Sequence, residues 1–171
     1  MMTKGGKILK LIEINMEALI ETISHLDDNL GKSFLDTITG EVLYIPTEVS
    51  AALENGTLKE NDFDSWLKEF VNVAMLICDD EVNRYLSTPL IDEAFYIKAM
   101  EEYTNKMVNN TDLKLELKKA LNSEEPIKKF KHVLMDNQNG TDEWYKYEDS
   151  CINEFIISWL KSNDIEQKYL N

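Results

Sequence analysis

Residues 141–161, TDEWYKYEDSCINEFIISWLK, are the stretch that decides the fold. Apolar and aromatic residues recur in it at intervals of three and four, which is the spacing of one face of an α-helix. Thr141 is a suitable N-cap, and the two acidic residues after it lie near the positive end of the helix dipole. We therefore predict a helix of about six turns. Its apolar stripe consists of Trp144, Tyr147, Cys151, Ile152, Phe155, Trp159 and Leu160.

This predicted helix needs other segments to cover it. Two tryptophans and a phenylalanine on one helix face would expose a large apolar surface if the helix stood alone in water. The rest of the chain must therefore pack around it. The side chains that we predict to anchor the core are Trp144, Phe155, Trp159, Phe130, Trp66 and Phe70.

The clearest β signal is SFLDTITGEVLYIP at residues 33–46. Two β-rich runs, residues 33–37 and 41–45, flank Ile38-Thr39-Gly40, where glycine supplies the positive φ that a tight hairpin needs. Both faces of this hairpin carry apolar residues, so we expect both to be partly covered. Two strands alone are marginally stable, and the short run at residues 83–87 is the candidate third strand.

Most of the remaining chain has helical spacing. The fold class that follows is α+β, with a small antiparallel sheet packed against several helices and an all-helical C-terminal half. We expect a single domain over residues 1–171, in which residues 1–13 are the segment expected to be loosely ordered. The helix at residues 64–79 is apolar nearly all round, which predicts burial on two sides. Further helices are predicted at residues 14–27, 47–56, 92–107 and 111–121, and from Ser123, as N-cap, through Leu134.

Charge and composition exclude several classes of function. The chain has 171 residues, 43% of them apolar, and a formal net charge of −14. Nucleic acids and anionic membrane surfaces would repel such a chain, so we predict neither as a partner. The longest apolar run, Val73–Cys78, is too short to span a bilayer, and the N-terminal sequence lacks a signal-peptide pattern. We predict a cytoplasmic protein whose two cysteines, Cys78 and Cys151, are buried free thiols.

Four phrases occur in the order and spacing of a known family. They are LDTITGEVLYI (35–45), NRYLSTP followed by DEAFYIKAMEEY (83–103), LKKALNSEEPIKKFKHVL (within 114–134) and EWYKYEDSCINEFIISWL (143–160). Over roughly residues 14–166 the chain resembles an uncharacterised bacterial protein family, the one numbered one-five-eight. It departs from the family at residues 123–127, where we associate a glycine-rich turn with the family, and at residues 87–89. The family has no assigned activity, so the resemblance implies a fold and a bacterial cytoplasm.

Glu148 is the most informative polar residue. At 100° per residue it falls inside the apolar sector of the predicted last helix, and a buried carboxylate needs a partner or a proton. Arg84 is the only arginine of the chain and lies in the candidate third strand. We hypothesise a structural ion pair between Glu148 and Arg84 that locks the helix onto the sheet. A partly exposed residue at the edge of the stripe and a tuned acid in a pocket are the alternatives.

Other polar groups have simpler structural explanations. Glu21, His25 and Asp28 share a helix face, but no second group of ligands follows nearby, so we predict no metal. No motif of a nucleophilic or nucleotide-binding enzyme is present, and we predict no catalytic residue and no cofactor. We predict a local helix contact between His132 and Asp136 and a solvated acidic turn at residues 79–81. We also predict a solvated helix face that carries Lys114, Lys118, Lys119, Lys128, Lys129 and Lys131.

These observations favour a protein of unknown function that acts as a binding or regulatory module through protein–protein contacts. A small hydrolase or transferase that uses carboxylates such as Glu148 is the first alternative. An acidic mimic of nucleic acid that occupies the basic groove of a partner is the second. The sequence leaves the oligomeric state and the identity of any partner open.

Overall fold

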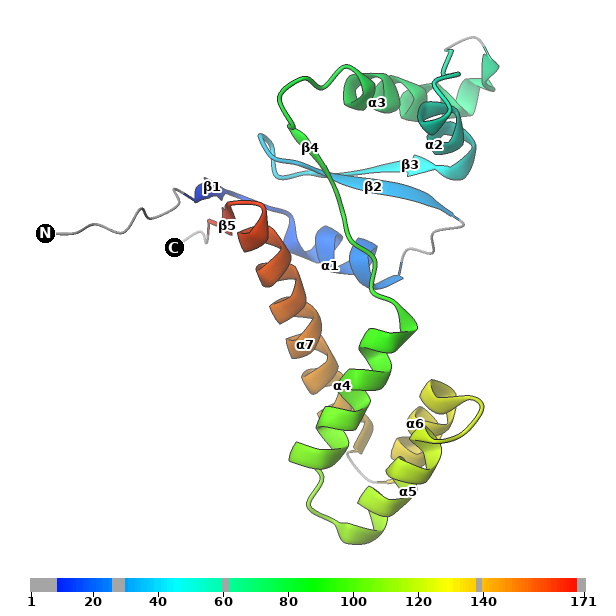
Figure 1. Ribbon diagram of the computed structural model, residues 1–171, viewed down its shortest axis with the longest axis vertical. Helices are drawn as coiled ribbons and strands as arrows, with labels where there is room; N and C mark the ends of the chain where they lie inside the picture. Colours follow the sequence, from blue (N-terminus) through cyan, green and yellow to red (C-terminus); the bar gives the residue numbers. More distant parts are fainter. Residues whose placement is uncertain (1–8, 26–29, 60–61, 138–139, 169–171) are drawn as a thin grey trace, which may run out of the picture. The chain divides into compact units, whose positions relative to one another are not determined.

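The computed structural model describes residues 9–25, 30–59, 62–137 and 140–168 (Figure 1). The chain divides into two compact units, which are described separately below. Unit 1 comprises residues 1–90 and 156–171, and unit 2 comprises residues 91–155. Helix α7 (Gly140–Ser162) contributes to both, because the boundary falls within it. That the whole chain folds as one domain stays a prediction.

Unit 1 contains the predicted antiparallel sheet. Strands β2 (Gly31–Asp36) and β3 (Val42–Pro46) form the hairpin, and β4 (Tyr85–Ser87) pairs with the other edge of β2, giving the order β3-β2-β4. In this register Leu35 lies opposite Val42 on one side and Leu86 on the other. The predicted hairpin and third strand are therefore confirmed, with the hairpin strands extending one or two residues outward to Gly31 and Pro46.

The sheet of unit 1 is covered on both faces. Phe34 and Leu35 are consecutive in β2 and therefore point to opposite faces, and both are buried. Phe34 packs in a cluster with Val49 of α2 (Thr47–Glu54) and Val71 of α3 (Lys68–Cys78). Helix α1 (Met16–His25) lies on the other side of the sheet (Figure 1). The Asn15 side chain caps this helix, because it accepts a hydrogen bond from the Ala18 amide at 3.1 Å.

The hairpin turn is fixed to the segment before α1. Gly40 has φ of +77°, as its role in the turn predicts, and its carbonyl accepts a hydrogen bond from the Asn15 amide at 3.1 Å. The close approach leaves no space for a side chain, because a Cβ at Gly40 would lie 1.8 Å from the carbonyl oxygen of Glu13. Glycine is therefore required here both for the backbone angle and for the contact.

We expect Gly40→Ala to lower the free energy of unfolding by more than about 2 kcal/mol, because the left-handed conformation alone costs an L-residue about 1–2 kcal/mol and the contact must also open. Gly56→Ala is the matched control. Gly56 has φ of +63°, but a Cβ there meets nothing within 4 Å, so this variant should lose only the conformational part. Urea unfolding followed by circular dichroism measures both, and equal losses would contradict the close contact.

A parallel strand pair joins distant parts of the chain within unit 1. Strand β1 (Lys10–Ile12) pairs with β5 (Ile165–Gln167), with Lys10 opposite Ile165. The Gln167 side chain strengthens this junction, since its Oε1 accepts from the Ile14 amide at 2.9 Å and its Nε2 donates to the Ile14 carbonyl at 3.2 Å. The expectation that residues 1–13 are loosely ordered is thus wrong for residues 10–12. Residues 1–8 lie outside the described residues.

Unit 2 is helical and is built around Trp144. It consists of α4 (Glu93–Lys106), α5 (Thr111–Leu121), α6 (Pro126–Met135) and the N-terminal part of α7. The ring centroid of Trp144 lies 5.3 Å from Tyr103 and 5.1 Å from Phe130, and all three side chains are buried. The helix predicted at residues 141–161 is confirmed to within one residue at each end.

Several details of the predicted core need correction. Trp66 is not a core residue: it lies in the 3₁₀ helix η2 (Ser65–Leu67) and is 62% exposed, while its neighbour Leu67 points into the core. Phe70, Phe155 and Trp159 are half-buried. Cys78, expected to be buried, is exposed at the end of α3. The buried residues of this helix are Val71 and Ala74, so it buries one side and not two. Ser123 does not cap α6, which begins at Pro126 after Glu125.

Candidate functional site

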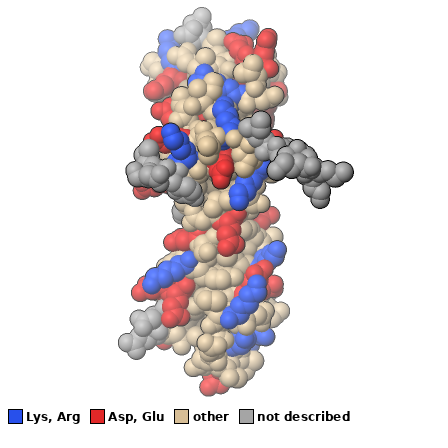
Figure 2. Space-filling view, turned by 90° about the vertical axis from the view of Figure 1, so that its left-hand side faces the viewer, with Lys and Arg blue, Asp and Glu red and all other residues tan. Residues whose placement is uncertain are grey.

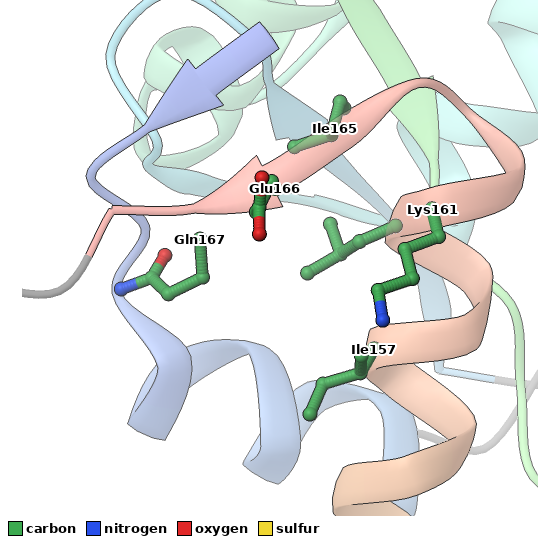
Figure 3. A pocket seen from close by; sticks show the side chains of 6 residues that line it. Ile157, Lys161, Ile165, Glu166 and Gln167 are labelled. Atoms are coloured by element: carbon green, nitrogen blue, oxygen red, sulfur yellow. The ribbon is translucent and has the colours of Figure 1, made fainter. Parts of the chain in front are cut away.

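A small pocket lies in unit 1 between the last turns of α7 and strand β5 (Figure 3). Its volume is about 190 Å³. Glu166 extends from β5 and Lys161 from α7, on two sides of the hollow, and Ile157 points into it from the preceding helix turn. Leu160, Ile165 and Gln167 complete the lining.

Arg84 has a different partner from the one that we predicted. Its Nε donates to Asp36 Oδ1 at 2.9 Å and its Nη2 donates to Asp36 Oδ2 at 2.6 Å. This bidentate bond holds the pKa of Asp36 at about 2, below the ordinary value of 3.8, and the Ile38 amide assists by donating to the same carboxylate. The hypothesis of an ion pair between Arg84 and Glu148 is corrected accordingly. The strand register places Tyr85 opposite Asp36, and the preceding residue, Arg84, bonds the Asp36 carboxylate.

The acidic turn after α3 is a structural extension of this pair. Asp80 accepts from the Val82 amide at 3.1 Å and from the Tyr85 amide at 3.0 Å, and these bonds lower the pKa of its carboxyl. Arg84 also lies over the Tyr85 ring, 5.0 Å from its centroid. Because the amide of Tyr85 opens β4, the Asp80 carboxylate occupies a backbone donor that another strand could otherwise use. These groups hold the end of the sheet together.

Glu148 is buried in unit 2, as its place in the helix pattern predicts. It is 8% exposed, and its Oε1 lies 3.8 Å from Nζ of Lys131 on α6. The Lys131 ammonium also lies 5.8 Å from the centroid of the Tyr145 ring. This arrangement ties α6 to α7 through charge, and it leaves the Glu148 carboxylate inaccessible to a substrate. The cation beside Glu148 is therefore Lys131, and not Arg84 as we hypothesised.

Cys151 does not have the surroundings of a nucleophile. It is half-buried on α7, and burial raises the pKa of its thiol. Burial likewise raises the pKa of the neighbouring Tyr147 hydroxyl to about 12. A reactive cysteine needs the opposite shift, because the thiolate is the nucleophilic form.

Four exposed apolar side chains occur along η2, α3 and the loop that follows, and we call this set of residues the α3 face. It carries Trp66, Met75 and Leu76, which are 62%, 42% and 58% exposed, and Val82 in the following loop is 78% exposed. Sequence reasoning assigned the first of these to the core. The signal that could have shown its exposure is the three-residue spacing from Trp66 to Glu69 and from Glu69 to Asn72, which places it on a polar stripe.

The remaining predicted polar groups make local contacts. His132 Nε2 lies 3.8 Å from Asp136 Oδ2, and Lys128 pairs with Glu125 at 3.1 Å. Within the part of the chain that the structure describes, no three His, Cys, Asp or Glu side chains are placed to share a metal ion. Asp28 and the His25 side chain lie outside it. Among the described helices, none combines the length and apolar character needed to cross a bilayer.

The fold is thus α+β, with a small antiparallel sheet in unit 1 and a helical unit 2 built on Trp144. A model of an uncharacterised protein family, UPF0158, matches residues 10–170, and the chain belongs to that family. The resemblance noted in the sequence is thereby confirmed.

Comparison with known proteins gives one bacterial relative. The chain is similar to UPF0158 protein PA5073 of Pseudomonas aeruginosa, with 40% identity over 50 residues. The aligned part covers 29% of this chain and 33% of the relative, so the chain spans about a third of that relative's length. No solved structure matches the chain.

Proposed function

We propose that the protein is a binding module of the bacterial cytoplasm that docks a basic partner protein on its α3 face. The exposure of Trp66 together with Met75 and Leu76 carries this proposal. Single exposed apolar residues are ordinary, but several within one short segment, including a tryptophan, are typical of interfaces. Tryptophan is enriched among the residues that contribute most to binding.

The charges around the α3 face indicate the kind of partner. Among the described residues 59–82 there are six acidic side chains and two lysines, so the apolar residues have an acidic rim. Such a rim attracts a basic surface and repels an acidic one. The acidic residues of this segment are Asp62, Asp64, Glu69, Asp79, Asp80 and Glu81.

Two observations favour this function over the alternatives. A hydrolase or transferase using Glu148 would need its carboxylate to reach a substrate, and that carboxylate is buried beside Lys131. A mimic of nucleic acid would need a track of like charges, whereas basic side chains lie among the acidic ones on the face in Figure 2. The exposed thiol of Cys78 also fits the reducing cytoplasm.

The experiment is affinity capture with the purified chain as bait and a bacterial lysate as source. We expect the double variant Trp66→Ser/Leu76→Ser to lose a captured protein by at least about tenfold, because each anchor contributes on the order of 1–2 kcal/mol. Retention of that protein should also fall between about 50 and 500 mM salt, because salt screens charges at a rim.

The matched control is Leu115→Ser, which removes an exposed leucine of α5 that is 54% exposed. It should capture the same protein as the wild type. If the double variant retains every protein that the wild type captures, the α3 face is not the docking surface and the proposal is wrong.

A further inference from the structure

The pocket between α7 and β5 combines an apolar floor with two opposite charges. Its floor includes Leu160 and Ile165, each 2% exposed, with Ile157 beside them. Lys161 and Glu166 stand on two sides of the hollow, and their charged ends are directed toward it (Figure 3). A pocket of this kind suits a small molecule with an apolar part and both a positive and a negative group.

The two charges are available to a ligand. Elsewhere in the chain, lysines pair with nearby carboxylates, as Lys106 does with Glu102 at 2.7 Å. Neither Lys161 nor Glu166 forms an ion pair with any residue that the structure describes, although both line the same hollow. They therefore remain free to bind the opposite charges of a molecule lying between them.

The wall of the pocket is fixed in place. Gln167 uses both ends of its side-chain amide to bond the backbone of Ile14, so it holds β5 and does not serve as a free ligand group. The pairing of β5 with β1 holds Glu166 opposite Leu11 in the register. A wall that is ordered before binding lowers the entropic cost of binding.

The volume of about 190 Å³ limits the size of the ligand. Pockets for drug-sized molecules measure about 300–1,000 Å³, so the hollow suits a smaller metabolite. We propose that it binds a free α-amino acid with an apolar side chain. The carboxylate of the amino acid would pair with Lys161, its ammonium group with Glu166, and its side chain would lie on Ile157, Leu160 and Ile165. This inference does not depend on the proposed docking function.

The experiment is titration calorimetry of the full chain with L-leucine. We expect saturable binding with a dissociation constant at or below about 1 mM, given the affinity per atom typical of very small ligands. Leucinamide lacks the carboxylate and N-acetyl-leucine lacks the ammonium group, and each should bind at least about tenfold more weakly. These two analogues also stand for the N-terminus and the C-terminus of a peptide, so they separate a free amino acid from a peptide end.

Variants test the two charged residues. Lys161→Met and Glu166→Gln should each weaken leucine binding at least about tenfold, whereas Lys68→Met and Glu48→Gln, which remove exposed charges elsewhere in unit 1, should leave it unchanged. Leucine should also shift the amide signals of Glu166 and Gln167 in the NMR spectrum of the wild type, which needs no variant to fold. Absence of saturable binding by leucine up to about 10 mM, tenfold above the expected constant, would overturn the proposal. Binding of leucinamide or N-acetyl-leucine as tightly as leucine would also overturn it.

Discussion

Replacing Trp144 by alanine is expected to lower the free energy of unfolding by about 3–5 kcal/mol, the range for large aromatic residues removed from a core. Trp144 is fully buried and lies against Tyr103 and Phe130 at the centre of unit 2. Since small proteins are stable by only about 5–15 kcal/mol, this single change should remove a large part of the stability. Urea unfolding followed by far-ultraviolet circular dichroism measures it.

Two further variants define the cause of this loss. Trp144→Phe keeps a ring in the core and removes an indole N–H that has no hydrogen-bond acceptor among the described residues, so it should cost less than half as much as alanine. Trp159→Ala removes a tryptophan that is only half-buried and should cost clearly less than Trp144→Ala. A loss below about 1 kcal/mol for Trp144→Ala would show that this side chain does not anchor the core.

The same unfolding curves bear on the number of domains. One cooperative transition in the wild type would support the predicted single domain.

Asp36→Ala is expected to lower the free energy of unfolding by about 3 kcal/mol, the lower end of the range for breaking a buried ion pair. Asp36 is 3% exposed, and its loss leaves Arg84 without its bidentate partner and the Ile38 amide without its acceptor. The lower end applies because the Arg84 side chain is 35% exposed and water can hydrate it. The surface pair of Glu102 and Lys106 is the comparison, and Glu102→Gln should cost less than about 1 kcal/mol.

The same carboxylate predicts a dependence of stability on pH. Its pKa is about 2 in the folded protein, against the ordinary value of 3.8 that applies to the unfolded chain. A depressed pKa stabilises the folded protein above the unfolded value, so this contribution is complete above about pH 4 and is lost as the pH falls toward 2. It amounts to about 2 kcal/mol. Other carboxylates also titrate between pH 2 and pH 5. The measurement is therefore the difference in free energy of unfolding between the wild type and Asp36→Asn, and this difference should shrink from pH 5 to pH 2. A difference that does not change with pH would contradict this assignment.

The sequence predicted those helices and strands whose spacing of apolar residues repeats over several turns or along paired strands. The stripe at residues 141–161 gave the right helix because three-and-four spacing over many residues has one solution. The hairpin was predictable because Gly40 needs a positive φ between two β-rich runs. The burial of Glu148 followed from the same helical geometry, with no knowledge of what covers it.

The partners of the charged residues could not be predicted in this way. Arg84 meets Asp36 because β4 pairs with β2 in one particular register, and a shift of two residues would place another side chain beside the guanidinium. Lys131 meets Glu148 because α6 packs against α7 at one level along its axis. Trp66 was assigned to the core because its helix carries apolar residues nearly all round, and the polar spacing from Trp66 to Glu69 and Asn72 is a much weaker signal.

The candidate pocket depends still more on tertiary structure. Lys161 is the last residue of the predicted helix, with no sign in the sequence of what it faces, and Glu166 belongs to a strand of three residues that carries no β signal. That strand exists because it pairs with β1, more than 150 residues earlier in the chain. The sequence alone determined the helices, the hairpin and the acidic character of the protein, because those depend on neighbours within a few residues. Only the tertiary structure decided which charges meet, which apolar side chains remain in water and where the pocket forms, because those depend on contacts between segments that are far apart in the chain.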